Sequence, residues 1–480
     1  MPAITGKDYI LRINQLKANI WHEGKKIIGN ISEHPTYKGA IKSQAMLYDL
    51  QHQEDVKDLM TYFSPQTGDR VGTSFLQPKT KEDLTKRRKM TMEWAKTNGG
   101  MLGRSPDYMN TVLMSFAASA SILEGKENCF PENLVHFYEQ AREQDLSFTH
   151  TFINPQVNRS QLYFEDAEEP ISATIIDKNK EGLVVKGAKL LATQGGMTDE
   201  LLVLSPGGIT SKANAFAFSV PSDINGLKFI TRESFVNGES SFNYPLSSRF
   251  EEIDTIVVFD DVVVPWERVF FYDNLEVANS FKNQSAFLPF TLHQVVCRQV
   301  VKTKFLLGVA QSIVDTINIS EYQHIQEKVT EIIVALETME ALLTKAEWNA
   351  SIDEFGLMRP ELAPLQVASC TYPTVYSKLT EIIQILGSSG MISIPTEKDF
   401  NSEIRGDLTK YLQSATKDGK ERVQLFRLAW DLTMSAFGTR QTQYERFFFG
   451  HPIRLTSELY HSYDKTEYIN LIHKFLKSKG

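Results

Sequence analysis

The sequence is poor in cysteine. Its three cysteines, Cys129, Cys297 and Cys370, lie far apart and form no CxxC pair. An odd number of scattered thiols argues against a disulfide framework and against a cysteine-rich metal site. We therefore expect a protein without a bound metal, working in a reducing cytoplasm.

Several nucleotide and metal motifs are also missing. The chain contains no GxGxxG, no GxxxxGK[ST] and no HExxH. It therefore shows no dinucleotide fingerprint, no phosphate-binding P-loop and no zinc-protease helix. If the protein carries out redox chemistry, we expect it to do so without binding NAD(P)H on a Rossmann unit of its own.

Long apolar runs and an excess of basic charge are absent as well. No run approaches 18 apolar residues, and the first fifteen residues lack a charged start followed by an apolar core, so we expect neither a membrane span nor a secretory signal. The net charge is −8 without a strongly basic segment, which argues against nucleic-acid binding. The composition, 42% apolar and 23% charged, is that of a globular protein with two or three structural units.

The pattern of residues changes twice along the chain. Helical spacing dominates residues 1–146, short β-type runs separated by Gly, Pro and Asn fill residues 147–272, and helical spacing returns in residues 273–480. We predict a mostly helical α+β fold with an N-terminal helical domain, a middle antiparallel β-barrel and a C-terminal four-helix bundle with an extension. The expected helices cover 38–63, 80–97, 107–124, a short stretch from 131, 297–318, 322–349, 362–386 and 403–437.

The stretch from Phe148 to Ser160 holds the most informative residues. His150 stands where a predicted extended segment enters a loop, and Pro155 ends regular pairing because it has no N–H. A histidine there can exchange a proton near neutral pH, and the amides and Arg159 that follow can hold a polar ring or a phosphate. The alternative is a buried core histidine and an arginine in a surface ion pair.

Further polar clusters have two interpretations each. Arg104 and Tyr108, in GRSPDYMN, could together hold an anionic oxygen, or could belong to an ordinary helix cap. Thr193, in ATQGGMT, could meet flavin heteroatoms, or could sit in a plain hairpin. Ser205 and Pro206 begin a Gly-rich loop that could act as a lid.

Taken together, these stretches resemble a known family. TGKDYI, GRSPDYMN, THTFINPQVNR, GAKLLATQG, FDDVVVPWERVF and RLAWDLTMSAFGTRQTQYERFFFG are similar to segments of the oxygenase component of 4-hydroxyphenylacetate 3-monooxygenase, a flavin-dependent phenol hydroxylase. The resemblance runs over nearly the whole chain and implies an acyl-CoA dehydrogenase-like fold. It also implies a two-component system, in which a separate NAD(P)H:flavin reductase supplies FAD as FADH2. With O2, a C4a-hydroperoxyflavin would then hydroxylate a phenol ortho to its hydroxyl group. A homotetramer is implied as well.

The resemblance also implies roles for individual residues. Arg104, Tyr108 and His150 would be catalytic and hold the phenol oxygen, and Ser205 and Pro206 would lie over the substrate. The residues expected to contact FAD are His150, Thr151, Phe152, Ile153, Gln156, Val157, Asn158, Arg159, Thr193, Thr439, Arg440, Gln443 and Tyr444.

Other interpretations remain open at this point. His293 and Cys297, in HQVVC, resemble part of the [4Fe–4S] site of 4-hydroxybutyryl-CoA dehydratase, but no cysteine pair accompanies them. A non-catalytic flavin-binding scaffold is a further alternative. Within the monooxygenase interpretation, the substrate could be 4-hydroxyphenylacetate or another phenol, such as a halophenol or a tyrosine-like compound.

Overall fold

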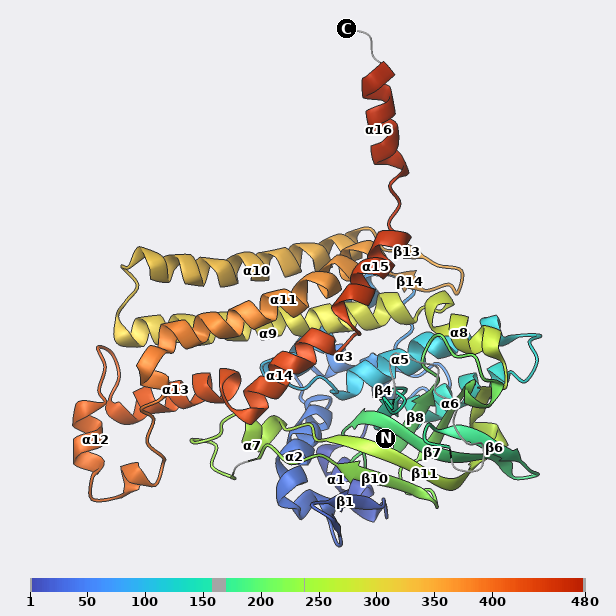
Figure 1. Ribbon diagram of the computed structural model, residues 1–480, viewed down its shortest axis with the longest axis horizontal. Coiled ribbons are helices and arrows are strands. Elements are labelled where there is room, and N and C mark those ends of the chain that lie inside the picture. The colour runs from blue at the N-terminus through green and yellow to red at the C-terminus, as the bar shows by residue number, and fades with distance from the viewer. Residues whose placement is uncertain (1, 158–169, 237, 478–480) are drawn as a thin grey trace.

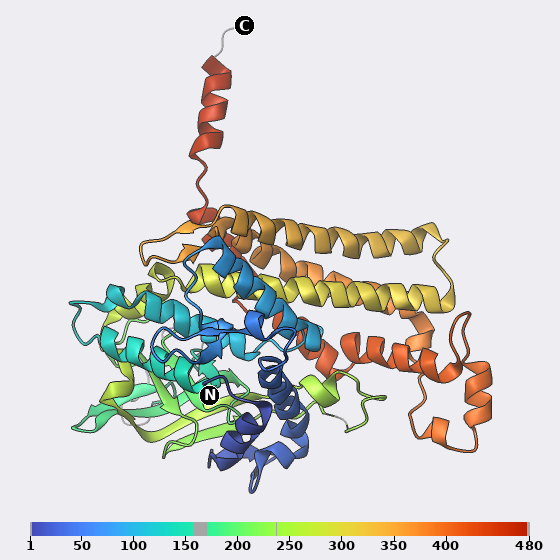
Figure 2. The same ribbon diagram turned by 180° about the vertical axis from the view of Figure 1, so that it is seen from behind.

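A β unit from the middle of the chain packs against helices from both ends of the chain (Figure 1). The computed structural model describes residues 2–157, 170–236 and 238–477. Seen from behind, the N-terminal helices, coloured blue to cyan, cover the junction between the sheets and the long C-terminal helices (Figure 2). The mostly helical α+β class is therefore confirmed.

The N-terminal helices begin at strong capping residues. Thr5 caps the first and Thr80 caps the fourth, and in each case an aspartate three residues later completes a capping box. The helix expected over 38–63 is wrong beyond residue 50, because Thr61-Tyr62-Phe63 is β-prone and pairs with residues 70–72. The helices are α1 (Gly6–Gln15), α2 (Pro35–Leu50), α3 (Lys57–Met60), α4 (Lys81–Thr97), α5 (Pro106–Ala118) and α6 (Pro131–Gln144).

The β unit contains two sheets with a shared apolar core. The six-stranded sheet has the order β2-β1-β10-β11-β7-β6, and the four-stranded sheet has the order β12-β9-β8-β5. Most neighbours are antiparallel, but β1 runs parallel to β10 and β5 parallel to β8, since these strands come from distant parts of the chain. The strands are β1 (Ile20–His22), β2 (Lys25–Lys26), β5 (Phe148–Thr151), β6 (Thr174–Lys178), β7 (Gly182–Thr193), β8 (Glu200–Leu204), β9 (Phe216–Pro221), β10 (Leu227–Thr231), β11 (Asp254–Pro265) and β12 (Val269–Tyr272).

The barrel form of this unit is not confirmed. Within the described residues the two sheets meet at one corner, where a bridge joins Ile153 to Leu190 of β7. Buried side chains of both sheets, such as Val203, Phe218, Phe229 and Val257, fill the space between them. Small hairpins outside this unit pair β3 (Thr61–Phe63) with β4 (Arg70–Gly72) and β13 (Ser351–Ile352) with β14 (Met358–Arg359).

Long helices form the C-terminal bundle. The stripe predicted in the second of them is confirmed, because Ile325, Val329, Ile332, Leu336, Met339 and Leu343 are all buried. The single helix expected over 403–437 is wrong: Asp418 and Ser435 each cap a new helix. The helices are α7 (Ser247–Phe250), α8 (Leu275–Gln284), α9 (Phe287–Ile317), α10 (Gln323–Trp348), α11 (Leu362–Gly387), α12 (Arg405–Tyr411), α13 (Gly419–Thr433), α14 (Ala436–Phe447), α15 (Pro452–Ser462) and α16 (Thr466–Lys477). Short 3-10 turns complete the chain at Ile31–Glu33, Thr73–Phe75, Ala120–Leu123, Lys212–Asn214, Trp266–Arg268, Ser388–Met391 and Asp399–Asn401.

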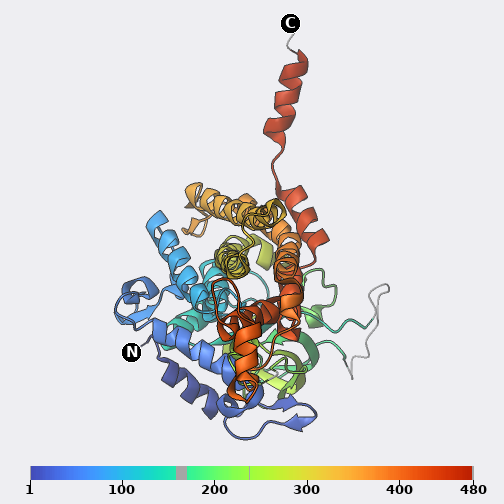
Figure 3. The ribbon, with the colours of Figure 1, turned by 90° about the vertical axis from the view of Figure 1, so that its left-hand side faces the viewer.

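The last helix stands apart from the rest of the molecule. In three views α16 projects away from the bundle, beyond the end of α15 (Figures 1, 2 and 3). It has no buried residue, although Leu471, Phe475 and Leu476 are among its side chains. None of the helices in the described part of the chain is both long and apolar enough to cross a lipid bilayer.

Candidate active site

The loop before α5 holds Arg104 in a fixed position. The backbone N–H groups of Gly103 and Arg104 donate to the Glu252 carboxylate at 2.9 and 2.6 Å. A side chain at position 103 would collide with Tyr444, whose hydroxyl oxygen lies 2.1 Å from the place of a Cβ, so only glycine allows this approach. The Arg104 guanidinium thereby donates to the Tyr444 hydroxyl at 2.9 Å and lies 4.6 Å from the Tyr108 ring centre.

His150 faces the same place from the β unit. It lies on β5, which pairs with β8, and its ring centre is 5.9 Å from that of Tyr108 and 5.5 Å from that of Phe152. Its Nδ1 is buried without a hydrogen-bond partner among the described residues. Burial, and then the charges of Arg104 and Lys282, hold the pKa of His150 well below its usual range. The imidazole is therefore neutral near pH 7, with an unused polar atom.

Tyr108 completes this polar end. Burial raises the pKa of Tyr108, although Arg104 opposes the rise, so its phenol stays protonated at neutral pH. Three groups of different character thus converge: a permanent cation, a neutral imidazole and a phenol. They are suited to an oxygen atom that loses a proton and gains negative charge.

These groups lie at one end of an aromatic cavity of about 140 Å³. Among the described residues that line it there are three cations and no carboxylate. A cavity of this size suits one aromatic ring with a short side chain. The lining residues are Arg104, Tyr108, Val112, Phe116, His150, Phe152, Leu204, Ser205, Pro206, Gly207, Phe271, Ala278, Phe281, Lys282, Phe287, Phe448, Phe449 and Arg454.

The predicted substrate loop lines this cavity too. Ser205 and Pro206 follow β8, and the Ser205 hydroxyl donates to the carbonyl oxygens of Asn214 and Phe216 at 2.7 and 2.8 Å. The Asn279 side chain accepts from the backbone of Gly208 at 2.8 Å and so ties the loop to α8. The Ser205 side chain is therefore used to hold the loop.

The structure distributes the predicted flavin residues over two segments. Thr151 is buried and donates to the Leu190 carbonyl at 2.8 Å, while Phe152 and Ile153 are half-buried. Gln156 and Val157 are exposed. Asn158 and Arg159 lie outside the described residues.

The second segment is on α14. Arg440 donates to Asp254 at 2.8 Å and lies 3.5 Å from Glu252, and Thr193 donates to Asp254 at 2.9 Å. The Arg440 and Arg232 guanidinium groups hold the pKa of Asp254 far below its usual range, against the effect of burial. Arg440 and Thr193 are thus bonded within the chain, and Tyr444 points to Arg104. Two further predicted residues of this segment are exposed, Thr439 and Gln443.

Several residues of the cavity were absent from the sequence-based prediction as site residues, among them Lys282, Phe448, Phe449 and Arg454. The two phenylalanines belong to a run of three that begins at Phe447, the last residue of α14. Lys282 and Arg454 carry no local signal, because each is one cation in an ordinary amphipathic helix. His293 and Cys297 have structural positions: His293 lies 2.8 Å from Glu347, and Cys297 is a buried core thiol with a raised pKa due to burial.

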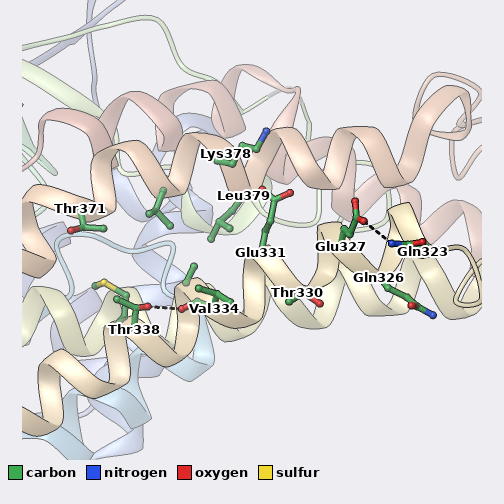
Figure 4. A pocket seen from close by; sticks show the side chains of 13 residues that line it. Gln323, Gln326, Glu327, Thr330, Glu331, Val334, Thr338, Thr371, Lys378 and Leu379 are labelled. Carbon is green, nitrogen blue, oxygen red and sulfur yellow. Dashed lines mark hydrogen bonds between the residues drawn. The ribbon is translucent and has the colours of Figure 1, made fainter.

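A larger hollow lies elsewhere. A groove of about 660 Å³ runs between α10 and α11 on the outside of the bundle (Figure 4). Figure 4 shows Glu327, Glu331 and Val334 on α10 and Lys378 and Leu379 on α11. Its lining, all of it described, contains no histidine, arginine or tyrosine. Volume alone would select this groove, but convergent polar groups with shifted pKa values select the smaller cavity.

Comparison with solved structures establishes the class of protein. A dehydratase described as oxygen-tolerant archaeal 4-hydroxybutyryl-CoA dehydratase from N. maritimus superposes with a TM-score of 0.86 at 20% identity, covering 98% of this chain and 94% of that one. An acyl-CoA dehydrogenase from Geobacillus kaustophilus superposes with a TM-score of 0.51 at 14% identity, over 81% of this chain and 86% of that one. The chain therefore has the acyl-CoA dehydrogenase-like fold, as the sequence predicted.

The particular family follows from the sequence. The family model 4-hydroxyphenylacetate 3-hydroxylase N terminal matches residues 5–271, and its C-terminal counterpart matches residues 278–477. The chain belongs to the 4-hydroxyphenylacetate 3-hydroxylase family. It is 61% identical to the probable 4-hydroxyphenylacetate 3-monooxygenase of Bacillus subtilis (strain 168) over 99% of both chains.

Other relatives carry related descriptions. The crystal structure of an oxygenase component of 4-hydroxyphenylacetate 3-monooxygenase, complexed with FAD and 4-hydroxyphenylacetate, has a TM-score of 0.94 at 43% identity, covering 99% of this chain and 98% of that one. The 4-nitrophenol 2-monooxygenase oxygenase component of a Rhodococcus species is 29% identical, over 93% of this chain and 86% of its own. The phenols named for these two relatives differ in their para substituent, which is a carboxymethyl group in one and a nitro group in the other.

The surface beside the cavity fits a flavin ring. Leu191 of β7 has a left-handed φ of 61° and is 54% exposed, two residues before Thr193. An exposed leucine with strained backbone needs a reason, and a flat apolar ring lying on it would provide one. The preceding Leu190 is bridged to Ile153, so the two predicted flavin segments of the β unit lie together.

Proposed function

We propose that this protein is the oxygenase component of a two-component, FADH2-dependent phenol hydroxylase, acting on 4-hydroxyphenylacetate. The observation that carries this proposal is the buried, unpartnered Nδ1 of a neutral His150 beside Arg104 and Tyr108, at the end of a cavity sized for one ring. Overall, phenol, O2 and FADH2 give catechol, water and FAD. When bound, FADH2 supplies the electrons and the site of O2 activation.

The chain's own residues bind and activate the phenol. The neutral imidazole of His150 accepts a hydrogen bond from the phenol hydroxyl, and takes up its proton as the ring becomes nucleophilic. Arg104 stabilises the negative charge that then develops on the phenol oxygen, and Tyr108 donates a further hydrogen bond. The phenylalanines of the cavity exclude water, which strengthens each of these interactions.

The cofactor contacts are proposed from the two flavin segments. We infer that Thr151, Phe152, Ile153, Gln156, Val157 and Thr193 of the β unit, with Thr439, Arg440, Gln443 and Tyr444 of α14, hold FAD. Support comes from the exposed Leu191 and from the hydroxyl and amide groups that both segments present. FADH2 arrives by diffusion from a separate NAD(P)H:flavin reductase.

A direct experiment tests the activity. Protein mixed with anaerobically reduced FAD is exposed to oxygenated buffer with 4-hydroxyphenylacetate, and catechol and hydrogen peroxide are quantified. We expect catechol in proportion to FADH2 consumed. Peroxide alone with 4-hydroxyphenylacetate, but catechol with another phenol such as 4-nitrophenol, would transfer the activity to that substrate. Peroxide alone with every phenol would reject the proposal.

We further propose a homotetramer. Support comes from α16, which exposes Ile469, Leu471, Ile472 and Leu476 and buries none of its residues in its own subunit. The groove between α10 and α11 offers a second apolar surface, where Val334 is 58% exposed (Figure 4). Light scattering should give four times the subunit mass for the full chain and a smaller species after deletion of residues 466–480. A monomeric full chain would contradict this assembly.

We also propose the division into units at 1–146, 147–272 and 273–480. Strands β1 and β2 lie within residues 1–146 but belong to the six-stranded sheet of the middle unit, because β1 pairs with β10 and β2 pairs with β1. The first two units should therefore unfold together. Limited proteolysis should therefore release the last unit before it separates the first from the second.

A further inference from the structure

The aromatic cavity carries positive charge that the proposed phenol chemistry does not use. Lys282 lies on α8 and Arg454 on α15, and both line the cavity. The Lys282 amine is 5.2 Å from the Phe287 ring centre, 5.9 Å from that of Phe152 and 6.0 Å from that of Phe449. Aromatic rings thus surround an ammonium group.

Lys282 has no carboxylate of its own. Among the described residues its amine forms neither an ion pair nor a hydrogen bond. The residue is exposed, and its side chain lines the cavity. Burial, and then the charge of Arg454, lower the pKa of Lys282 to about 8, so the amine is mostly protonated at neutral pH. An enclosed cation without a counter-ion is unfavourable unless a ligand supplies one.

Arg454 can contribute to the same anion. Its Nε lies 3.4 Å from a carboxylate oxygen of Glu458, and the two side chains are 58% and 48% exposed. An exposed pair at this distance is weak. Because Arg454 reaches the cavity with a planar guanidinium, it can also accept a carboxylate there.

The two ends of the cavity are linked through one ring. Phe152 stacks on His150 with an interplanar angle of 8°, and Lys282 lies on the same ring. Lys282 is close enough for its charge to act on His150. A phenol whose hydroxyl meets His150 therefore occupies the same cavity as the Lys282 side chain.

We propose that Lys282, assisted by Arg454, binds the carboxylate of the para side chain and so determines specificity for acidic phenols over neutral ones. This inference rests on the proposed phenol hydroxylation. The site accepts an aromatic acid with a short side chain, because the walls between the two charged ends are apolar and hold no acidic residue among the described ones. A neutral phenol would leave Lys282 without a counter-ion.

The test compares two substrates of similar shape, 4-hydroxyphenylacetate and its uncharged amide. For Lys282→Met, which removes the charge and keeps the stem, the ratio of kcat/KM for the acid to that for the amide should fall about tenfold or more. Lys282→Arg should restore part of this ratio, and Arg454→Met should lower it less. Lys304→Met is the matched control, because this lysine lies on α9 in an exposed pair with Glu340.

Calorimetry of 4-hydroxyphenylacetate with the protein, without turnover, separates this inference from the proposed function. If the wild type binds the acid more tightly than the amide and Lys282→Met abolishes the preference, the inference holds even if no phenol is hydroxylated. If Lys282→Met weakens acid and amide equally, Lys282 merely shapes the cavity and the inference is rejected. If it weakens FAD binding and leaves the acid-to-amide ratio unchanged, the cation serves the cofactor phosphates and the inference is again rejected.

Discussion

One cluster of charge on α9 and α14 is buried, and a second lines the aromatic cavity. In the first, Glu445 accepts from Arg298 at 2.5 and 3.0 Å and from Lys302 at 2.8 Å, and Gln441 accepts from the same lysine at 2.7 Å. In the second, Arg104 and Lys282 reach the aromatic cavity, and none of the described carboxylates lines it.

The presence or absence of a carboxylate distinguishes a cluster of charges that serves structure from one that serves function. In the first cluster Arg298 and Lys302 hold the pKa of Glu445 at about 2, against the effect of burial, so both cations share a carboxylate inside the protein. Such a cluster has no need of a ligand. The second cluster is incomplete in the same physical sense, and a bound anionic group would complete it.

Breaking the balanced cluster should have the largest effect. Glu445→Gln leaves two buried cations without their counter-ion, and we expect a loss of about 3–5 kcal/mol in the free energy of unfolding. Urea unfolding measures this loss. The control is Glu340→Gln, an exposed partner of Lys304, which should change stability by at most about 1 kcal/mol. Equal losses in the two variants would show that burial of the Glu445 cluster does not increase its contribution to the free energy of unfolding.

Breaking the polar end of the cavity should affect chemistry and leave stability largely intact. His150→Ala should lower the yield of catechol about a hundredfold, with hydrogen peroxide formed in its place, because the group that accepts the phenol proton is gone. Product analysis after a fixed amount of FADH2 measures both species. His136→Ala, at an exposed position on α6, is the control. A normal catechol yield from His150→Ala would remove this residue from the mechanism.

Arg104→Met should have a smaller effect on binding. The phenol oxygen would lose one charged hydrogen bond, which corresponds to about a tenfold weaker affinity for the phenol at the lower limit of such bonds. Equilibrium dialysis measures the dissociation constant. Arg446→Met alters an exposed arginine of α14 and should leave the affinity as it is. If both variants bind alike, Arg104 has no role in holding the phenol.

Lys189 sharpens the comparison, because it is a buried cation that meets no carboxylate among the residues the structure describes. Its amine donates to the Asn154 side chain at 2.7 Å, and burial lowers its pKa to about 7. The unfolded chain binds more protons there between pH 7 and about 10.4, so this group makes stability rise with pH across that window, by at most about 1.4 kcal/mol per pH unit.

Unfolding at pH 7 and pH 9 tests this. The rise in stability between the two values should be smaller in Lys189→Met than in the wild type, while Lys180→Met, an exposed control in a turn, should retain it. If the two variants and the wild type show the same pH dependence, the lysine is charged in the folded protein.

Local sequence patterns predicted the long elements, whose own apolar side chains form a regular pattern. Helix α10 was expected over residues 322–349 and was found within one residue at each end, since its apolar stripe faces a continuous core. Strands β1 and β12 were missed. Each is short and is stabilised by a partner far along the chain, which local spacing does not reveal.

The candidate site was predictable to a similar degree. Arg104, Tyr108 and His150 stood in distinctive segments, and the structure brings them to one cavity end. Lys282 was missed, because nothing in α8 indicates that its lysine meets aromatic rings from β5, α9 and the segment after α14. That the predicted Arg440 would pair with Asp254 and Glu252 also depends on tertiary contacts alone.

The detached helix α16 has a consequence for how the protein responds to dilution. A helix of 12 residues with no buried side chain is marginal in water by itself. If neighbouring subunits cover it, its helicity is linked by mass action to the total protein concentration. The order of α16 then depends on the protein concentration. The helix is ordered at high concentration, and at low concentration it becomes an apolar segment open to proteases and chaperones.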